Sequence, residues 1–137
     1  WKDYRTPRFI GDMPHTWVGS DFINAARALF IYENEYDSSL VIGAGLKKEW
    51  IDYDRGISIE DLYNNYGTLS YSVKKEGDSY RIKIWGEMNK PNGGIIIKNF
   101  NEKKMPITVM IDGKATKGFD ESSIHINKFP AEVIIKY

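Results

Sequence analysis

The hydrophobic pattern of this chain changes its period once, near residue 39. From there to the end, apolar and polar residues alternate with a period of 2 in runs rich in Val, Ile, Thr and Tyr, which is typical of strands buried on one face. About eight such runs follow one another. They read "SLVIGAGL", "GISIEDLY", "GTLSYSVKKE", "DSYRIKIWGE", "GGIIIKNF", "MPITVMID", "SSIHINKF" and "AEVIIKY".

This alternation predicts a mainly β fold, an antiparallel β-sandwich over residues 39–137. It argues against a parallel sheet, because parallel strands are buried on both faces and read as continuous apolar runs with helices between them. Turn residues separate several runs, among them residues 76–78 and 89–94. Asp112 and Gly113 form a dipeptide suited to a tight hairpin.

The hairpin from Leu69 to Glu87 gives the sharpest structural prediction. Its apolar residues alternate in phase on both sides of the turn, so they are expected to face one core. The opposite phase would bury Lys74, Arg81 and Lys83 without partners. The residues predicted to face the core are Leu69, Tyr71, Val73, Tyr80, Ile82 and Ile84.

Residues 11–33, "GDMPHTWVGSDFINAARALFIYE", are the one segment that predicts a long helix, of about five turns. Asp12 suits its N-cap and Pro14 its first turn, and the pattern fades between residues 34 and 39. We therefore assign residues 1–38 to an N-terminal segment and helix, and residues 39–137 to the sandwich. The apolar stripe consists of Val18, Phe22, Ala25, Ala26, Leu29 and Phe30.

A stripe this wide needs a partner surface, and two partners are open. The helix either covers one sheet of its own domain or is the last helix of another domain. The chain begins with Trp1 rather than Met, so we expect further sequence upstream.

Composition narrows the possible functions. A chain of 137 residues with 42% apolar residues can bury a core as one domain. Nineteen basic residues balance nineteen acidic ones without a local basic patch, so neither nucleic acid nor an anionic membrane is an expected partner. No apolar run approaches the ~20 residues of a membrane span. The absence of Cys excludes disulfides, thiolate zinc sites and Cys nucleophiles.

The start of the predicted helix offers one candidate binding site. His15 and Trp17 stand two residues apart, with Asp12 and Asp21 nearby. An aromatic ring covers the apolar C–H face of a sugar, while imidazole and carboxylate groups bind its hydroxyls. The alternative roles are structural: Asp12 as a helix cap, Trp17 as a core residue and His15 as a surface residue.

Trp85 is the second candidate, because the alternation places it on the charged face of its strand, beside Arg81 and Lys83. An exposed Trp of this kind either forms a platform for carbohydrate or packs against a neighbouring element, with basic side chains on its rim.

Other candidates are weaker. Residues 52–56, "DYDRG", lack the remaining ligands of a calcium loop and predict a turn. His125 should point outward between Ile124 and Ile126, and two His without Cys are too few for a transition-metal site, so no metal or cofactor is predicted. Glu33 and Glu35 are expected to be solvated at the helix end. Common hydrolase, nucleotide, dinucleotide and zinc-protease motifs are absent from the sequence.

The order of these pieces carries a resemblance. The segments "MPHTWVGSDFINAARALFIYE", "LVIGAGLKKEWI", "YGTLSYSVKKEGDSYRIKI", "NGGIIIK" and "FPAEVIIKY" follow one another over nearly the whole chain. Together they resemble the C-terminal region of bacterial glycoside hydrolases of the α-L-rhamnosidase-like type, common in polysaccharide-degrading Bacteroidetes. In those enzymes an (α/α)6 six-hairpin catalytic barrel precedes a β-sandwich.

The resemblance implies an accessory domain without catalytic residues. The family has a His-x-Trp near its final barrel helix, which His15 and Trp17 match. Its catalytic acid and base lie on barrel loops upstream, so this chain alone is expected to be inactive. The implied partner is an upstream catalytic barrel in the same polypeptide, and the implied location is periplasmic or extracellular.

Two other functions remain open. A carbohydrate-binding module should show a row or groove of exposed aromatic residues such as Trp85 on one sheet face. An accessory domain should instead have its exposed aromatic residues clustered where the helix meets the upstream domain. A glycosidase in its own right would need a concave pocket with two carboxylates about 5 to 9.5 Å apart.

Overall fold

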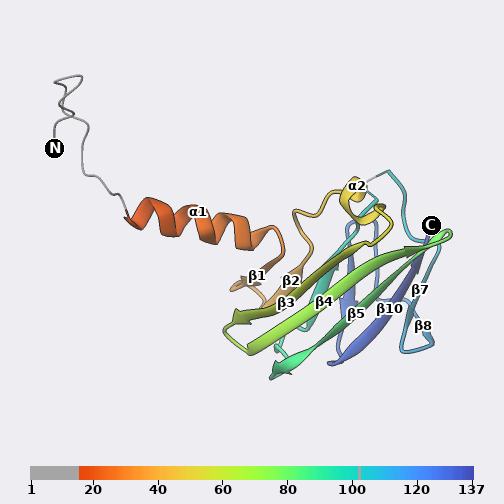
Figure 1. The fold of residues 1–137 in the computed structure, drawn as a ribbon. Helices are drawn as coiled ribbons and strands as arrows, with labels where there is room; N and C mark the ends of the chain where they lie inside the picture. The colour runs from red at the N-terminus through yellow and green to blue at the C-terminus, as the bar shows by residue number, and fades with distance from the viewer. Residues whose placement is uncertain (1–15, 102) are drawn as a thin grey trace, which may run out of the picture.

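The computed structural model describes residues 16–101 and 103–137. The chain forms two packed β-sheets, from which one helix projects (Figure 1). The helices are α1 (Thr16–Ala28) and α2 (Lys48–Ile51). The strands are β1 (Ile31–Asn34), β2 (Ser39–Ile42), β3 (Ile57–Asn64), β4 (Gly67–Glu76), β5 (Ser79–Met88), β6 (Ile95–Lys98), β7 (Thr108–Ile111), β8 (Lys114–Thr116), β9 (Ser123–Ile126) and β10 (Ala131–Lys136).

The predicted β-sandwich is confirmed. A four-stranded sheet has the order β1-β2-β6-β9, and a six-stranded sheet has the order β3-β4-β5-β10-β7-β8. Each of the eight predicted runs contains a strand, while β1 and β8 were not predicted. β8 is only three residues long and returns along β7 across the predicted hairpin turn, where Asp112 and Gly113 both have positive φ.

One strand pair departs from the antiparallel expectation. β2 and β6 pair in parallel, with Leu40 opposite Ile95 and Ile42 opposite Ile97. All four residues of β2 are buried, as are the first three of β6. These two runs are continuous apolar segments rather than alternating ones, which is the pattern of parallel strands buried on both faces.

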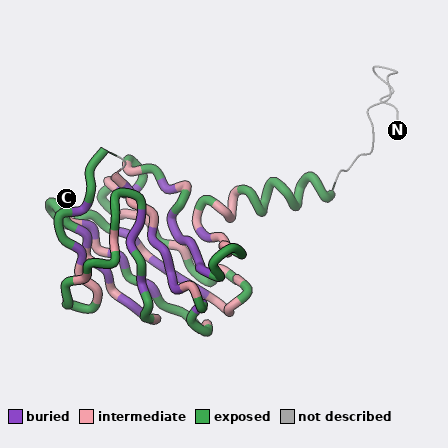
Figure 2. Tube along the Cα trace, turned by 180° about the vertical axis from the view of Figure 1, so that it is seen from behind, coloured by how far each residue is buried: buried purple, intermediate pink, exposed green. Residues whose placement is uncertain are grey.

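The core lies between the sheets, where buried residues from both concentrate (Figure 2). The six hairpin residues predicted to face it are all buried, from 0% to 4% exposed. Tyr71 is fully buried, and its hydroxyl donates a hydrogen bond to the backbone oxygen of Phe30 at 3.0 Å. Burial raises the pKa of Tyr71.

The predicted helix is too long at its C-terminal end. It ends at Ala28, and Ile31–Asn34 forms β1, which pairs antiparallel with β2. Ile31 is fully buried, so strand pairing and core burial outweigh the helical spacing in this segment. The β1–β2 hairpin crosses the expected division after residue 38. The expected caps Asp12 and Pro14 lie outside the described residues.

Two glycines fix the chain that follows the helix. The backbone N–H groups of Gly43 and Gly45 donate to the backbone oxygens of Phe30 and Leu29, both at 2.9 Å. A Cβ atom on Gly45 would lie 2.4 Å from the Leu29 side chain and 2.9 Å from its Cα. Glycine is therefore needed at position 45, because no side chain fits between it and the end of the helix.

Candidate functional site

The helix α1 extends away from the sandwich, and only its C-terminal end lies against the sheets (Figure 1). No residue of α1 is buried. Four large apolar side chains of α1 are exposed to solvent: Trp17 (64%), Val18 (47%), Phe22 (75%) and Ile23 (66%). This apolar surface is unusual for a helix of a globular domain, which normally turns its apolar stripe toward the core.

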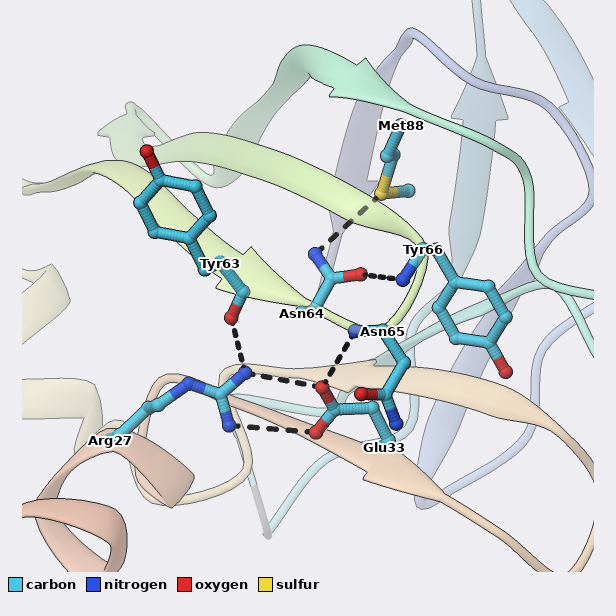
Figure 3. Close-up of polar contacts among 7 residues, drawn as sticks. All are labelled: Arg27, Glu33, Tyr63, Asn64, Asn65, Tyr66 and Met88. Atoms are coloured by element: carbon cyan, nitrogen blue, oxygen red, sulfur yellow. Dashed lines mark hydrogen bonds and ion pairs between the residues drawn. The ribbon is translucent and has the colours of Figure 1, made fainter.

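A polar cluster fixes the C-terminal end of α1 to both sheets (Figure 3). We call it the helix anchor, and it comprises Arg27, Glu33, Tyr63 and Asn65. Arg27 donates from Nη2 to Glu33 Oε1 at 3.2 Å and also to the backbone oxygen of Tyr63. Glu33 Oε1 accepts a second hydrogen bond, from the backbone N–H of Asn65 at 3.2 Å. The helix, β1 and the β3–β4 turn therefore meet at one ion pair.

Glu33 is ionised more easily here than in water. Its partial burial opposes ionisation, but the hydrogen bonds from Arg27 and from backbone N–H groups outweigh that cost and lower the pKa of Glu33. Only 19% of its side chain is exposed. The expectation that Glu33 is solvated at a helix end is therefore wrong, because the residue lies on β1 and faces Arg27.

The anchor also sets which way the apolar side of α1 faces. Arg27 follows Phe22 by five residues, so the two side chains point about 140° apart around the helix axis. Because Arg27 is bonded to the sandwich, Phe22 points to the side of the helix away from these bonds.

A second feature lies on the outer face of the six-stranded sheet. Trp85 on β5 is 39% exposed and borders an open hollow of about 470 Å³. We call this feature the Trp85 hollow. It lies between β5, the start of β10 and the β7–β8 turn, and is lined by Lys83, Trp85, Asp112, Lys128, Pro130 and Glu132, with Ile84 and Ala131.

The four charged groups of the hollow form ion pairs. Lys128 is paired with Asp112, and Lys83 Nζ lies 3.9 Å from Glu132 Oε1. The same oxygen forms a second ion pair with Arg81 Nη1, at 2.9 Å. The Lys128 hydrogen bond, aided by the backbone N–H of Glu132, lowers the pKa of Asp112. The Asp112 carboxylate therefore stays charged at neutral pH, and both carboxylates of the hollow lie beside a cation.

The structure does not bring the predicted site residues together. Trp17 and Asp21 lie on the projecting helix, both exposed, whereas Trp85 lies on the sandwich. His15 is outside the described residues. Trp17 is 64% exposed, which excludes the alternative role as a core residue.

The weaker candidates prove structural. Asp52 is the C-cap of α2 and accepts hydrogen bonds from Lys48 and from the Tyr80 hydroxyl. Residues 52–55 form a turn, as predicted. His125 is exposed between two buried isoleucines, also as predicted. Within residues 16–101 and 103–137, no three His, Asp or Glu side chains are grouped to hold a metal ion. In the same part of the chain, no helix is long and apolar enough to cross a membrane.

The sequence did not reveal the partners of Trp85 or of Arg27. The sequence predicts Asp112 only as a turn residue, because its place beside Lys128 and Glu132 depends on the pairing of β7 with β10. Arg27 and Glu33 are six residues apart, a spacing that has no meaning within one helix. They come into contact because α1 ends at Ala28 and the chain turns back into β1. The hydrophobic spacing does not predict this helix end.

Comparison with known proteins gave no relative: the chain matches no protein-family model, no curated protein and no solved structure.

Proposed function

We propose that this chain is a non-catalytic accessory β-sandwich domain of a carbohydrate-active enzyme, a glycoside hydrolase, and that α1 joins it to a helical catalytic barrel upstream in the same polypeptide. The observation that carries the proposal is the exposed apolar side of α1, held away from the sandwich by the helix anchor. The sandwich buries its core without this side of the helix.

The apolar side of α1 is large enough to stabilise such an interface. Full burial of a side chain such as Val18 or Phe22, which share the side opposite Arg27, contributes about 1.5–3 kcal/mol each. The ion pair of Arg27 and Glu33 holds the helix in one direction beforehand, so less conformational entropy is lost when another domain packs on it.

The resemblance described above supplies the rest of the proposal. It suggests an (α/α)6 barrel as the partner and a periplasmic or extracellular location. It also places the acid and base on the barrel, so the 137-residue chain alone should release no sugar from aryl glycosides, including an α-L-rhamnoside. Turnover by this chain, lost on substitution of Asp12 or Asp21, would move the chemistry to this domain.

The proposal is tested in the full-length protein. The reading frame before Trp1 should encode a helical catalytic domain, and Phe22→Asp should lower the thermal stability of that protein by several degrees. The matched control is Tyr53→Asp, which removes another exposed aromatic residue, near α2. Equal effects of the two substitutions, or no helical domain upstream, would refute the proposal.

The second candidate function is a carbohydrate-binding module. It is favoured by the placement of two exposed aromatic residues on one sheet face. Tyr63 pairs with Thr68, and Trp85 pairs with Ser70, so both side chains point outward from the six-stranded sheet. Tyr63 is 78% exposed, and its ring points away from the helix anchor (Figure 3).

A further inference from the structure

We propose that the Trp85 hollow binds a neutral saccharide, with one sugar ring stacked on Trp85. This inference rests on the second candidate function and deepens it by naming the site and the class of ligand. It is independent of any interface made by α1.

The hollow offers an apolar surface for the face of a sugar ring. The Trp85 indole is partly exposed, and Pro130 and Ala131 line the hollow with it. The C–H groups of a pyranose pack on such a surface, which favours aromatic faces for sugar recognition. The volume of about 470 Å³ lies within the ordinary range of small-molecule sites.

The polar groups of the hollow suit hydroxyls. The Asp112 and Glu132 carboxylates can accept hydrogen bonds from sugar hydroxyls, and the ammonium groups of Lys83 and Lys128 can donate to them. These four groups come from four separate places around one Trp: β5, the β7–β8 turn, the β9–β10 loop and β10. Donors and acceptors are thus both available at the rim of the apolar surface.

The pairing of the charges selects a neutral ligand. Each carboxylate already has a cation: Asp112 has Lys128, and Glu132 has Arg81 and Lys83. A uronic acid or a phosphosugar would have to compete with these carboxylates for the cations, and it would meet their negative charge. A neutral saccharide adds hydroxyl hydrogen bonds without breaking either ion pair.

Asp112 is held in place before any ligand arrives. Its backbone N–H donates to the backbone oxygen of Glu132 at 2.8 Å, and its Oδ1 accepts from the Glu132 backbone N–H at 2.9 Å. Two opposed hydrogen bonds therefore fix the β7–β8 turn against β10. A fixed acceptor loses little conformational entropy on binding, which favours recognition by a shallow site.

The test is affinity electrophoresis of the 137-residue chain through gels that contain one polysaccharide each. The neutral probes are xyloglucan, galactomannan, arabinan and rhamnan, and the acidic probe is polygalacturonate. We expect retardation by at least one neutral polysaccharide. Trp85→Ala should weaken that binding by at least about tenfold, because the stacking surface is lost. Lys128→Ala, at a largely exposed side chain, should weaken it by a smaller factor and leave the unfolding midpoint unchanged.

Trp50→Ala is the matched control, since Trp50 is 45% exposed but lies on α2, and it should bind like the parent chain. Retardation by polygalacturonate alone, or equal binding by the parent and Trp85→Ala, would overturn the proposal. If Tyr63→Ala abolishes binding and Trp85→Ala does not, the second candidate function stands and this site is wrong. If no probe retards the parent chain, both fail, and the accessory-domain proposal is untouched.

Discussion

Two isoleucines of this chain show how differently its two regions use apolar residues. Ile82 on β5 is fully buried between the sheets, whereas Ile23 on α1 is 66% exposed. The sandwich buries apolar residues in its own core, where they stabilise the fold, whereas α1 leaves them exposed. Apolar surface that does not stabilise the fold in which it sits is the usual mark of an interface.

The two regions also differ in what holds them. The sandwich is held by a continuous core from both sheets and by paired strands. The helix is held at one end, by the ion pair of Arg27 and Glu33 and by the hydrogen bonds of Gly43 and Gly45 to the residues that follow it. The helix α1 should therefore unfold locally, and its unfolding should leave the sandwich folded.

The largest expected effect is in the sandwich. Ile82→Ala should lower the free energy of unfolding by about 2–5 kcal/mol, because it leaves a cavity between the sheets. Lys83→Ala, at the next position and on the outer face, should cost well under about 1 kcal/mol. Chemical denaturation of both variants measures the difference. Similar unfolding midpoints would contradict the assigned strand phase.

The success of the sequence in the sandwich has a physical reason. In the β4–β5 hairpin a tight turn follows Glu76, which pairs with Ser79, so alternation on one strand fixes alternation on the other. A shift by one residue would bury Arg81 and Lys83, so only one register is acceptable. In this hairpin the alternation of apolar residues and the packing of the core require the same strand register.

The sequence-based predictions fail where contacts between residues distant in the sequence determine the structure. Leu29 and Phe30 fit a helical stripe, but the pairing of Ile31 with Ile42 turns the chain into a strand. The same holds for the Trp85 hollow. The outward position of Trp85 follows from alternation, whereas its neighbours Asp112 and Lys128 lie in the β7–β8 turn and the β9–β10 loop. The pairing of β10 with β5 and β7 brings them beside Trp85. No periodicity within one segment contains that information.

An intermediate effect is expected at the helix anchor. Glu33→Gln should cost about 1 kcal/mol at pH 7, because it removes the charge that pairs with Arg27. The lowered pKa of Glu33 means that this contribution is present above the ordinary carboxyl pKa and is lost as the pH falls through the lowered value. The stability gap between the parent chain and the variant should therefore close in acid.

Unfolding midpoints at pH 7 and at about pH 2.5 measure this gap. Glu35→Gln is the control, since Glu35 is exposed in the neighbouring β1–β2 turn, and it should change little at either pH. A gap for Glu33→Gln that persists unchanged in acid would mean that the ion pair does not hold the helix end.

The smallest expected effect falls on the apolar side of α1. Phe22→Ala should change the free energy of unfolding of the 137-residue chain by no more than about 0.5 kcal/mol, because the side chain is 75% exposed and touches no core. Chemical denaturation of Phe22→Ala and Ile82→Ala compares the loss of unfolding free energy at an exposed helix position with that at a buried core position. In the full-length protein the order should change, since Phe22 is then buried at the proposed interface and its truncation should cost about as much as a core residue. A Phe22→Ala variant that destabilises the 137-residue chain as strongly as Ile82→Ala would show that α1 belongs to the fold of the sandwich itself, and the interface proposed for it would have to be withdrawn.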